Sequence, residues 1–180
     1  MKRVVVTGLG LFTSIGFDVK TSWENLLSCK SGIKKINTFE VIDLPCKIAG
    51  YIESDSEQSH HINSIFENKD FKRNDRFILY GLVAAKEAIE DSGINFLTEE
   101  QKLRTGVSVG SGIGGLETIY NNSNILDNKG PRRISPFFVP ASLINLLSGQ
   151  ISIKYGLKGP NHSVVTACAT GAHSIGDSAE

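Results

Sequence analysis

Hydrophobic positions along the chain follow strand and helix periods in turn. At the N-terminus, the β-branched run of KRVVVTGLG predicts a buried strand that ends at glycine. Apolar residues at helical spacing predict a helix between Asp75 and Gly93, with one face formed by Ile78, Leu82, Ala85 and Ile89. An earlier helix, capped by Thr21 or Ser22, is expected to run as far as Gly32.

The rest of the pattern alternates in the same way. Residues 33–70 are polar and irregular, with one possible strand over Cys46–Ile52. Thr105–Val109 and His162–Ala167 are predicted strands, and the segment SLINLLSGQISIKYG between them predicts a helix whose Gly149 indicates close packing. Prolines exclude a regular element from NKGPRRISPFFVP. Strands that alternate with helices predict an α/β domain with a largely parallel sheet.

Charge and composition narrow the class of protein. The 180 residues carry 19 basic and 19 acidic side chains, so no net positive charge holds the chain on nucleic acid or on an anionic membrane. No apolar stretch approaches the ~18 residues that a membrane span needs. The three cysteines include no CxxC pair, which argues against a disulfide framework or a zinc module. We expect a soluble, cytoplasmic protein without a signal peptide.

The segment SVVTACATGAHSIG carries the strongest chemical signal. Its β-branched strand delivers Cys168 to a turn of small residues, and a helix over Gly171–Glu180 begins at once. Such a strand–turn–helix lifts a nucleophile out of a sheet, and the N–H groups at the helix start favour a thiolate over a thiol. Cys168 is therefore a candidate nucleophile, and a buried structural cysteine is the alternative.

The other cysteines and the histidines lack this context. Cys29 ends a helix and Cys46 lies in a polar stretch, so neither is expected to react. The pair His60–His61 has no third ligand at metal-binding spacing, and no metal site is expected. His173 lies five residues beyond the candidate nucleophile, roughly 140° around a helix, which makes it a poor direct base. We expect a histidine whose ring nitrogens are satisfied by packing partners.

The glycine loop GSGIGG allows two interpretations. Gly110, Gly112 and Gly115 satisfy G-x-G-x-x-G between a strand and a helix, where a dinucleotide fingerprint belongs. That fingerprint needs an acidic residue about 20 residues later, where this chain has the proline-broken RRISPFFVP. In the alternative, the glycines let the backbone pass close to a neighbouring element or to an acyl chain.

The motif TACATG, preceded by YGLKGP, resembles the nucleophile motif of the β-ketoacyl-[acyl-carrier-protein] synthases, the condensing enzymes of fatty-acid synthesis. VVVTGLG, ILYGLVAAKEAIEDSG, GSGIGG and PRRISPFFVP extend the resemblance over residues 1–180 and favour the elongating type II branch. By this resemblance Cys168 is the catalytic cysteine. The chain would be the N-terminal β-ketoacyl synthase domain, ending at the start of the nucleophile helix.

The resemblance implies a thiolase-like α/β fold of two similar halves, each a sheet flanked by helices, in a homodimer. It implies that Cys168 accepts an acyl group from acyl carrier protein and that malonyl-carrier protein supplies the attacking carbanion, without a cofactor. The family's two catalytic histidines and its structural lysine belong to the C-terminal half. Residues 1–180 alone are therefore expected to lack activity.

Further site residues follow from the same resemblance. Ile113 is expected at the floor of the acyl pocket, with Phe137 and Phe138 near the dimer partner. Two basic clusters, Lys69/Lys72/Arg73 and Arg132/Arg133, are otherwise solvated surface charge. The resemblance assigns carrier-protein docking to Lys69, Lys72, Arg132 and Arg133.

Rival interpretations come from other classes of protein. A non-catalytic partner subunit of the chain-length-factor kind keeps the fold but lacks the cysteine, so Cys168 argues against it. A truncated gene product without a working site is a second alternative. A dinucleotide-binding domain, weakened by the missing acidic residue, is the third.

Overall fold

A computed structural model describes residues 3–94 and 98–180. The described chain divides into two compact units. The larger unit comprises the described parts of residues 1–6, 66–82 and 94–180, and the smaller comprises residues 7–65 and 83–93. Helix α4 (Arg76–Asp91) contributes its first half to the larger unit and its second half to the smaller. None of the helices in the described ranges has the length and apolar character needed to cross a membrane.

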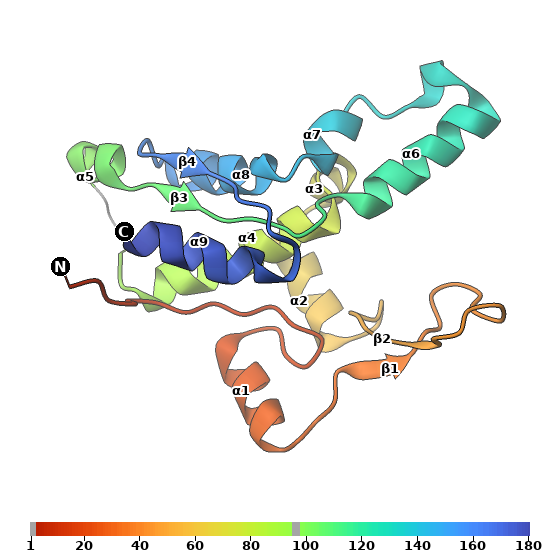
Figure 1. The fold of residues 1–180 in the computed structure, drawn as a ribbon, viewed down its shortest axis with the longest axis horizontal. Coiled ribbons are helices and arrows are strands. Elements are labelled where there is room, and N and C mark those ends of the chain that lie inside the picture. Colours follow the sequence, from red (N-terminus) through yellow and green to blue (C-terminus); the bar gives the residue numbers. More distant parts are fainter. Residues whose placement is uncertain (1–2, 95–97) are drawn as a thin grey trace. The chain divides into compact units, whose positions relative to one another are not determined.

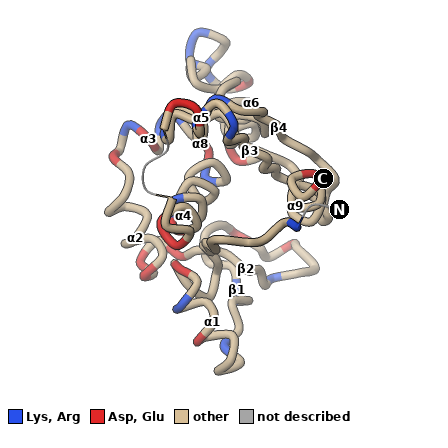
Figure 2. The backbone as a smooth tube through the Cα atoms, turned by 90° about the vertical axis from the view of Figure 1, so that its left-hand side faces the viewer, with Lys and Arg blue, Asp and Glu red and all other residues tan. Residues whose placement is uncertain are grey.

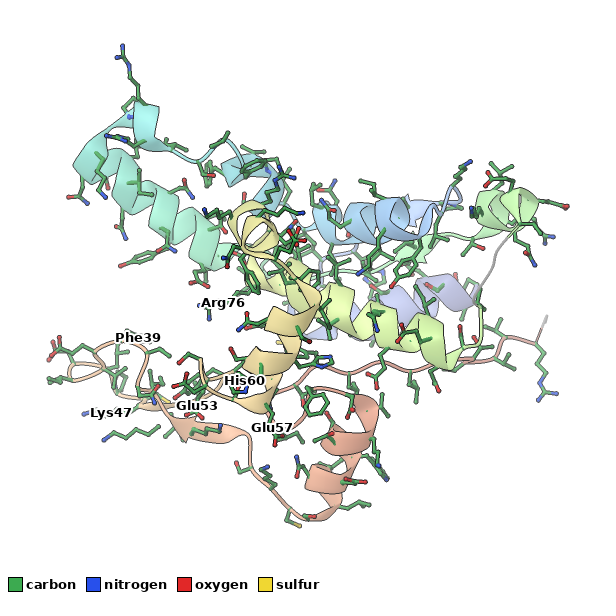
Figure 3. The ribbon with its side chains drawn as sticks, turned by 180° about the vertical axis from the view of Figure 1, so that it is seen from behind. Phe39, Lys47, Glu53, Glu57, His60 and Arg76 are labelled. Carbon is green, nitrogen blue, oxygen red and sulfur yellow. The ribbon has the colours of Figure 1, made fainter. Side chains whose placement is uncertain are left out.

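The smaller unit contains a helix, a hairpin and a second helix before it returns through α4. These elements are α1 (Val19–Leu27), β1 (Ile33–Lys35), β2 (Ile48–Gly50) and α2 (Glu57–Ile65). β1 and β2 pair antiparallel, and the loop that joins them carries Phe39 and Lys47 (Figure 3). The strand expected within Cys46–Ile52 is confirmed. Helix α2 was not predicted, because its sequence EQSHHINSI is mostly polar and buries only Ile62.

The segment predicted as an N-terminal strand forms no strand in the described chain. Val4, Val5 and Val6 are 58%, 59% and 77% exposed. The Leu9 N–H donates to the Asp91 carboxylate of α4 at 2.9 Å. The prediction is wrong because a strand needs a neighbouring strand to pair its peptide groups. Here the Leu9 N–H pairs with the Asp91 side chain of a helix instead.

Glu87 of α4 closes the loop that follows. One carboxylate oxygen accepts a hydrogen bond from the Leu11 N–H at 2.9 Å, and the other accepts from the Val19 N–H at 2.8 Å. Val19 is the first residue of α1. A single side chain of the smaller unit therefore fixes both ends of residues 11–19.

Helix α1 begins earlier than its sequence indicated. Asp18 caps it by accepting a hydrogen bond from the Thr21 N–H at 2.6 Å. The cap predicted at Thr21 or Ser22 is therefore wrong. A carboxylate at the helix start binds the free N–H groups at least as well as a hydroxyl, and its charge also suits the positive end of the helix dipole.

The larger unit is built around two short parallel strands, β3 (Val107–Ser108) and β4 (Asn161–His162). Helix α8 (Asn145–Tyr155) lies on one side of them and α9 (Thr170–Ala179) on the other (Figure 1). The remaining elements of this unit are α3 (Asn68–Arg73), α5 (Glu99–Arg104), α6 (Leu116–Lys129), the 3-10 turn η1 (Pro131–Arg133), α7 (Phe138–Ser142) and the 3-10 turn η2 (Ala167–Ala169).

The core of the larger unit joins the first half of α4 to α8. Ile78, Leu79 and Leu82 are buried, as are Leu147 and Ile151. The predicted helices are therefore confirmed. On the predicted face of α4, Ile78 and Leu82 are buried, whereas Ala85 and Ile89 are half-buried. Gly93, with φ of +70°, follows the end of α4.

Three local expectations for this unit fail. Helix α7 begins at Phe138, inside the segment from which prolines were expected to exclude a regular element, because Pro140 lies in the first turn, where its missing N–H costs no helical hydrogen bond. The atom nearest to a β-carbon placed on Gly149 is 3.9 Å away and belongs to Leu146 of the same helix, so no other element packs closely there. The predicted strand over His162–Ala167 is limited to β4, and Val165 is 53% exposed. Val164 and Val165 are β-branched and apolar, but residues 163–166 have no strand beside them in the described part of the chain.

One buried carboxylate connects α4 to α6. Asp75 precedes α4 and accepts a hydrogen bond from the Phe77 N–H in its first turn. The same carboxylate accepts hydrogen bonds from the backbone and the hydroxyl of Thr118, in the first turn of α6. Asp75 is 8% exposed, so these bonds replace the water that the charge loses on burial.

Candidate active site

Cys168 lies in the middle of η2, immediately before α9, and is exposed. The preceding residue, Ala167, has φ of +49°, in the left-handed region that residues other than glycine seldom adopt. Such a conformation costs about 1 kcal/mol or more and persists only where surrounding contacts enforce it. The turn-to-helix presentation of Cys168 is confirmed, although its approach is not part of a sheet.

Thr170 supplies the contacts that close this turn. Its hydroxyl accepts a hydrogen bond from the Thr166 N–H at 2.9 Å and donates one to the Ala167 carbonyl at 2.8 Å. The Thr170 N–H also donates to that carbonyl. Thr170 is 4% exposed, whereas residues 166–169 are all exposed. Thr170 was not predicted as a site residue, because its only signal in the sequence is a hydroxyl side chain two positions after the cysteine, at the helix start.

His173 has partners for both ring nitrogens. Nδ1 lies 3.3 Å from the Thr166 hydroxyl and Nε2 lies 3.2 Å from the Asp177 carboxylate. The expectation of a satisfied histidine is confirmed. The His173 ring therefore connects Thr166, where the turn begins, to α9.

The glycine loop of residues 110–115 lies against the cysteine turn. A β-carbon on Gly110 would collide with the Val164 carbonyl and would lie 2.5 Å from the methyl group of Thr170. A β-carbon on Gly112 would lie 3.1 Å from the Ala167 carbonyl oxygen. Only glycine lets the two backbones come this close, so the close-packing interpretation of GSGIGG is confirmed.

Of the residues expected to form the acyl pocket, one lies in this loop and two lie at the start of α7. Ile113 lies within it and is 67% exposed. Phe137 and Phe138 are half-buried at the start of α7, and the other end of α7 meets the loop where the Gly115 N–H donates to the Ser142 carbonyl at 3.1 Å. The structure therefore brings Ile113 beside the cysteine turn and joins α7 to the same loop.

The basic residues expected at the docking surface are exposed but differ in their partners. Lys69 donates a hydrogen bond to the Glu67 carboxylate at 2.8 Å, and this bond raises the pKa of Lys69. Lys72 is exposed on the same helix, and the Arg73 guanidinium lies 5.3 Å from the ring centre of Phe137. Figure 2 shows the basic residues on α3 and beyond the end of α6.

The second basic cluster lies on η1. Arg132 and Arg133 are both exposed. Arg133 lines a depression of about 560 Å³ together with Ile125 and Lys129 of α6. An anionic group could meet two cations there.

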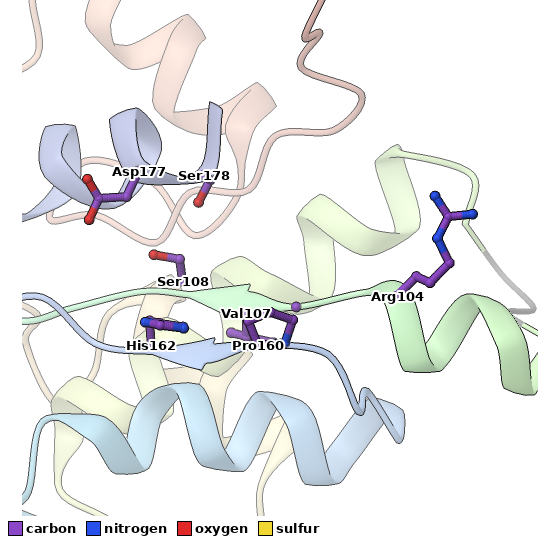
Figure 4. Close-up of a pocket in the computed structure, with 8 residues that line it drawn as sticks. Arg104, Val107, Ser108, Pro160, His162, Asp177 and Ser178 are labelled. Atoms are coloured by element: carbon purple, nitrogen blue, oxygen red, sulfur yellow. The ribbon is translucent and has the colours of Figure 1, made fainter. Parts of the chain in front are cut away.

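A further depression of about 510 Å³ lies between β3, β4 and α9 (Figure 4). Val107, Ser108, His162, Asp177 and Ser178 are among its lining residues. The Ser108 hydroxyl is buried and makes no hydrogen bond to the described residues. Cys168 and the expected acyl-pocket residues are not among the lining residues, so this depression is separate from the cysteine turn.

Comparison with known sequences places this geometry in a family. The model of the β-ketoacyl synthase N-terminal domain matches residues 1–180. The chain is 48% identical over 179 residues to 3-oxoacyl-[acyl-carrier-protein] synthase 2 of Rhizobium meliloti, and 44% identical to the protein of that name from Vibrio cholerae. These matches cover 98% and 99% of this chain but 42% of each relative. The chain thus spans less than half the length of these relatives.

Solved structures agree on the fold. The ishigamide ketosynthase/chain length factor superposes with a TM-score of 0.81 at 26% identity, over 98% of this chain and 43% of that one. A β-ketoacyl synthase from Burkholderia phymatum gives a TM-score of 0.73 over 99% of this chain and 43% of that one, and at 21% identity it shows the fold alone. The expected thiolase-like α/β half is confirmed. The cysteine turn, the glycine loop and these matches together establish that the chain belongs to the β-ketoacyl synthase family.

Proposed function

We propose that the full-length protein catalyses the condensation of acyl-[acyl-carrier-protein] with malonyl-[acyl-carrier-protein], giving a 3-oxoacyl product two carbons longer in fatty-acid elongation. The observation that carries this proposal is Cys168, exposed on a strained turn at the amino end of α9. The relatives named 3-oxoacyl-[acyl-carrier-protein] synthase 2 support the choice of substrates.

The first step is a thioester exchange at Cys168. Its thiolate attacks the carbonyl carbon of the acyl thioester, and a bond forms to the cysteine sulfur. The bond to the carrier's sulfur breaks, and that sulfur leaves as a thiol after taking a proton. The Cys168 N–H makes no backbone hydrogen bond within the described residues, so it is available as one donor to the oxyanion.

The second step forms the new carbon–carbon bond. Malonyl-carrier protein loses carbon dioxide, and the electron pair of the broken bond becomes an enolate. The enolate carbon attacks the acyl carbonyl, and the Cys168 sulfur leaves as thiolate. By the family resemblance, two histidines that stabilise the enolate lie in the part of the relatives that this chain does not span. The chemistry uses no redox cofactor and no metal.

The other site residues complete the proposal. Ile113, Phe137 and Phe138 line the slot for the acyl chain, the two phenylalanines beside the partner in a homodimer. The docking surface for the carrier protein is formed by Lys69, Lys72, Arg132 and Arg133. A structural neighbour, a type II PKS ketosynthase in complex with its acyl-carrier protein, supports this class of partner. The protein acts in the cytoplasm.

Intact-mass measurement of the full-length protein tests the proposal. Incubation with acyl-[acyl-carrier-protein] should add the mass of one acyl group to wild type and to Cys29→Ala, but not to Cys168→Ala. Addition of malonyl-[acyl-carrier-protein] should then release a 3-oxoacyl product. An adduct on Cys168→Ala, or no adduct on wild type, would contradict the proposal. The latter result would instead favour a non-catalytic subunit.

A further inference from the structure

We infer that Thr170 is a positioning residue, whose hydroxyl holds the backbone turn that aims Cys168 at the acyl carbonyl. The inference rests on the proposed function of Cys168 and concerns a residue that acts through it. Thr170 lies two positions after the nucleophile and is 4% exposed beneath a turn whose other residues are exposed.

The hydroxyl makes two bonds of opposite sense. It accepts from the Thr166 N–H at 2.9 Å and donates to the Ala167 carbonyl at 2.8 Å. Only a side chain that is both donor and acceptor can make this pair of bonds. The two partners are the N–H of Thr166 and the carbonyl of Ala167, which lie on either side of the Ala167 backbone turn, so the bonds fix the direction in which the chain enters the nucleophile.

The backbone between those partners would not stay in place by itself. Ala167 holds φ of +49°, and a residue with a β-carbon returns to negative φ when nothing restrains it. A change of φ at Ala167 would rotate every following atom, with Cys168 as the first. The hydroxyl of Thr170 bonds to the Ala167 carbonyl, which lies on the far side of that rotation.

The Thr170 hydroxyl does not cap the N-terminus of α9. Ala169 occupies the capping position of α9 and has no side chain that could cap it. A threonine near a helix start commonly accepts hydrogen bonds from N–H groups further along the helix. Here the Thr170 side chain turns back and binds the residues before the nucleophile instead.

The methyl group of Thr170 has a separate role. It packs against Gly110 so closely that a β-carbon there would lie 2.5 Å from it. The methyl group of Thr170 therefore packs against the glycine loop, and its hydroxyl positions the turn. Substitutions that remove one group at a time separate the two functions.

The test compares acyl transfer in full-length variants. Thr170→Val keeps the packing volume and removes the hydroxyl, and Thr170→Ser keeps the hydroxyl and removes the methyl. In single-turnover assays at saturating acyl-[acyl-carrier-protein], the acylation rate of Thr170→Val should fall about 30-fold, because a small misplacement of a nucleophile is costly. The carrier-protein concentration that gives half the maximal rate should not change. Thr170→Ser should stay within about threefold of wild type.

Two comparisons exclude a merely structural effect. Thr118→Val removes a hydroxyl that donates to the buried Asp75 carboxylate, so it should destabilise the protein but leave acylation at the wild-type rate. Iodoacetamide is small and needs no fixed approach, so alkylation of Cys168 in Thr170→Val should stay within about threefold of wild type. A parallel fall in acylation and alkylation would overturn positioning as the cause.

The remaining outcomes are equally decisive. Acylation of Thr170→Val reduced by less than about threefold, or Thr170→Ser as slow as Thr170→Val, overturns the inference alone. A wild-type protein that accepts no acyl group overturns the proposed function and this inference with it. Should Thr170→Val fail to fold, Thr170→Ser decides: a rate near that of wild type supports the hydroxyl, and a tenfold loss contradicts it.

Discussion

The Oδ2 atom of Asp75 accepts hydrogen bonds from both the backbone N–H and the hydroxyl of Thr118, at 2.9 and 2.7 Å. The two residues are 43 positions apart in the sequence. Asp75 also caps its own helix, α4, through the other carboxylate oxygen. One buried charge therefore satisfies free N–H groups at the starts of two helices.

Removal of this carboxylate should destabilise the protein. Asp75→Ala leaves the half-buried Thr118 N–H and hydroxyl without their partner, so the free energy of unfolding should fall by about 2 kcal/mol. Urea unfolding of the full-length protein, followed by circular dichroism, measures the change. The matched control is Glu117→Gln, whose 3.1 Å ion pair with Arg76 is exposed and should contribute about 0.5 kcal/mol or less. Equal losses in the two variants would contradict the buried cap.

Cys168 should be the only thiol that is alkylated rapidly at neutral pH. Cys29, Cys46 and Cys168 are all exposed, so accessibility does not distinguish them. Cys168 alone lies at the start of a helix, the position at which reactive cysteines are commonly found. Mass mapping of the full-length protein after brief iodoacetamide treatment gives the order of reaction. Equal labelling of Cys29 would count against the helix start as the cause.

Replacement of Arg132 and Arg133 by glutamate should raise the apparent KM for acyl-[acyl-carrier-protein]. Carrier proteins are acidic and this chain has no net charge, so attraction must come from local cations. Exposed charges are screened within about 10 Å at 0.1 M salt, so the effect should be largest at low salt. Steady-state kinetics at two salt concentrations measures it.

The control for this charge reversal lies in the other unit. Lys30→Glu with Lys47→Glu makes the same change in net charge at exposed positions of the smaller unit. That variant should leave KM unchanged. If both double variants behave alike, net charge rather than a docking surface governs the interaction.

The Glu99 carboxyl should titrate far below its ordinary range. The hydrogen bonds from Lys158 and then Lys102 lower its pKa from 4.5 to about 2. A carboxyl whose pKa is lowered in the folded state stabilises the fold above pH 4.5 and loses that contribution as the pH falls through about 2. Carbon-detected NMR of the full-length protein should show the Glu99 pKa rise in Lys158→Ala. Lys154→Ala removes a cation that lies over the rings of Phe66 and Tyr155 instead, and it should leave the Glu99 pKa unchanged.

Residues 1–180 expressed alone should bind ANS and elute early from a sizing column. Large apolar side chains lie exposed on α9, where Ile175 is 71% exposed, and in the run Val4–Val6. Exposed apolar surface on this scale favours association. A sharp monomer peak with cooperative melting and no ANS fluorescence would show that the chain is a complete domain.

The sequence predicted those elements whose evidence is local. Helices α4 and α8 follow from apolar residues at helical spacing, and on the predicted face of α4 Ile78 and Leu82 are buried. The N-terminal strand failed because a run of valines does not show whether another strand is available to pair with it. Helix α2 was missed because it buries a single isoleucine and has almost no periodic signal.

The same limit applies to the site. The motif around Cys168 predicts a nucleophile, because small residues and a helix start are adjacent in the chain. The role of Thr170 depends on Ala167 adopting positive φ, and alanine gives no indication of that in the sequence. The contact between Gly110 and the Val164 carbonyl spans 54 residues and is visible only once both segments are folded.

Because Glu87 accepts hydrogen bonds from the N–H groups of Leu11 and Val19, residues 11–19 form a ring that is closed without a covalent bond. The chain enters through Leu11 and leaves through Val19, and each end is held by a different oxygen of one carboxylate. A peptide bond broken inside this ring would leave the Leu11 and Val19 N–H groups bonded to one carboxylate of α4. Glu87 thus links the two sides of this loop independently of the backbone between them.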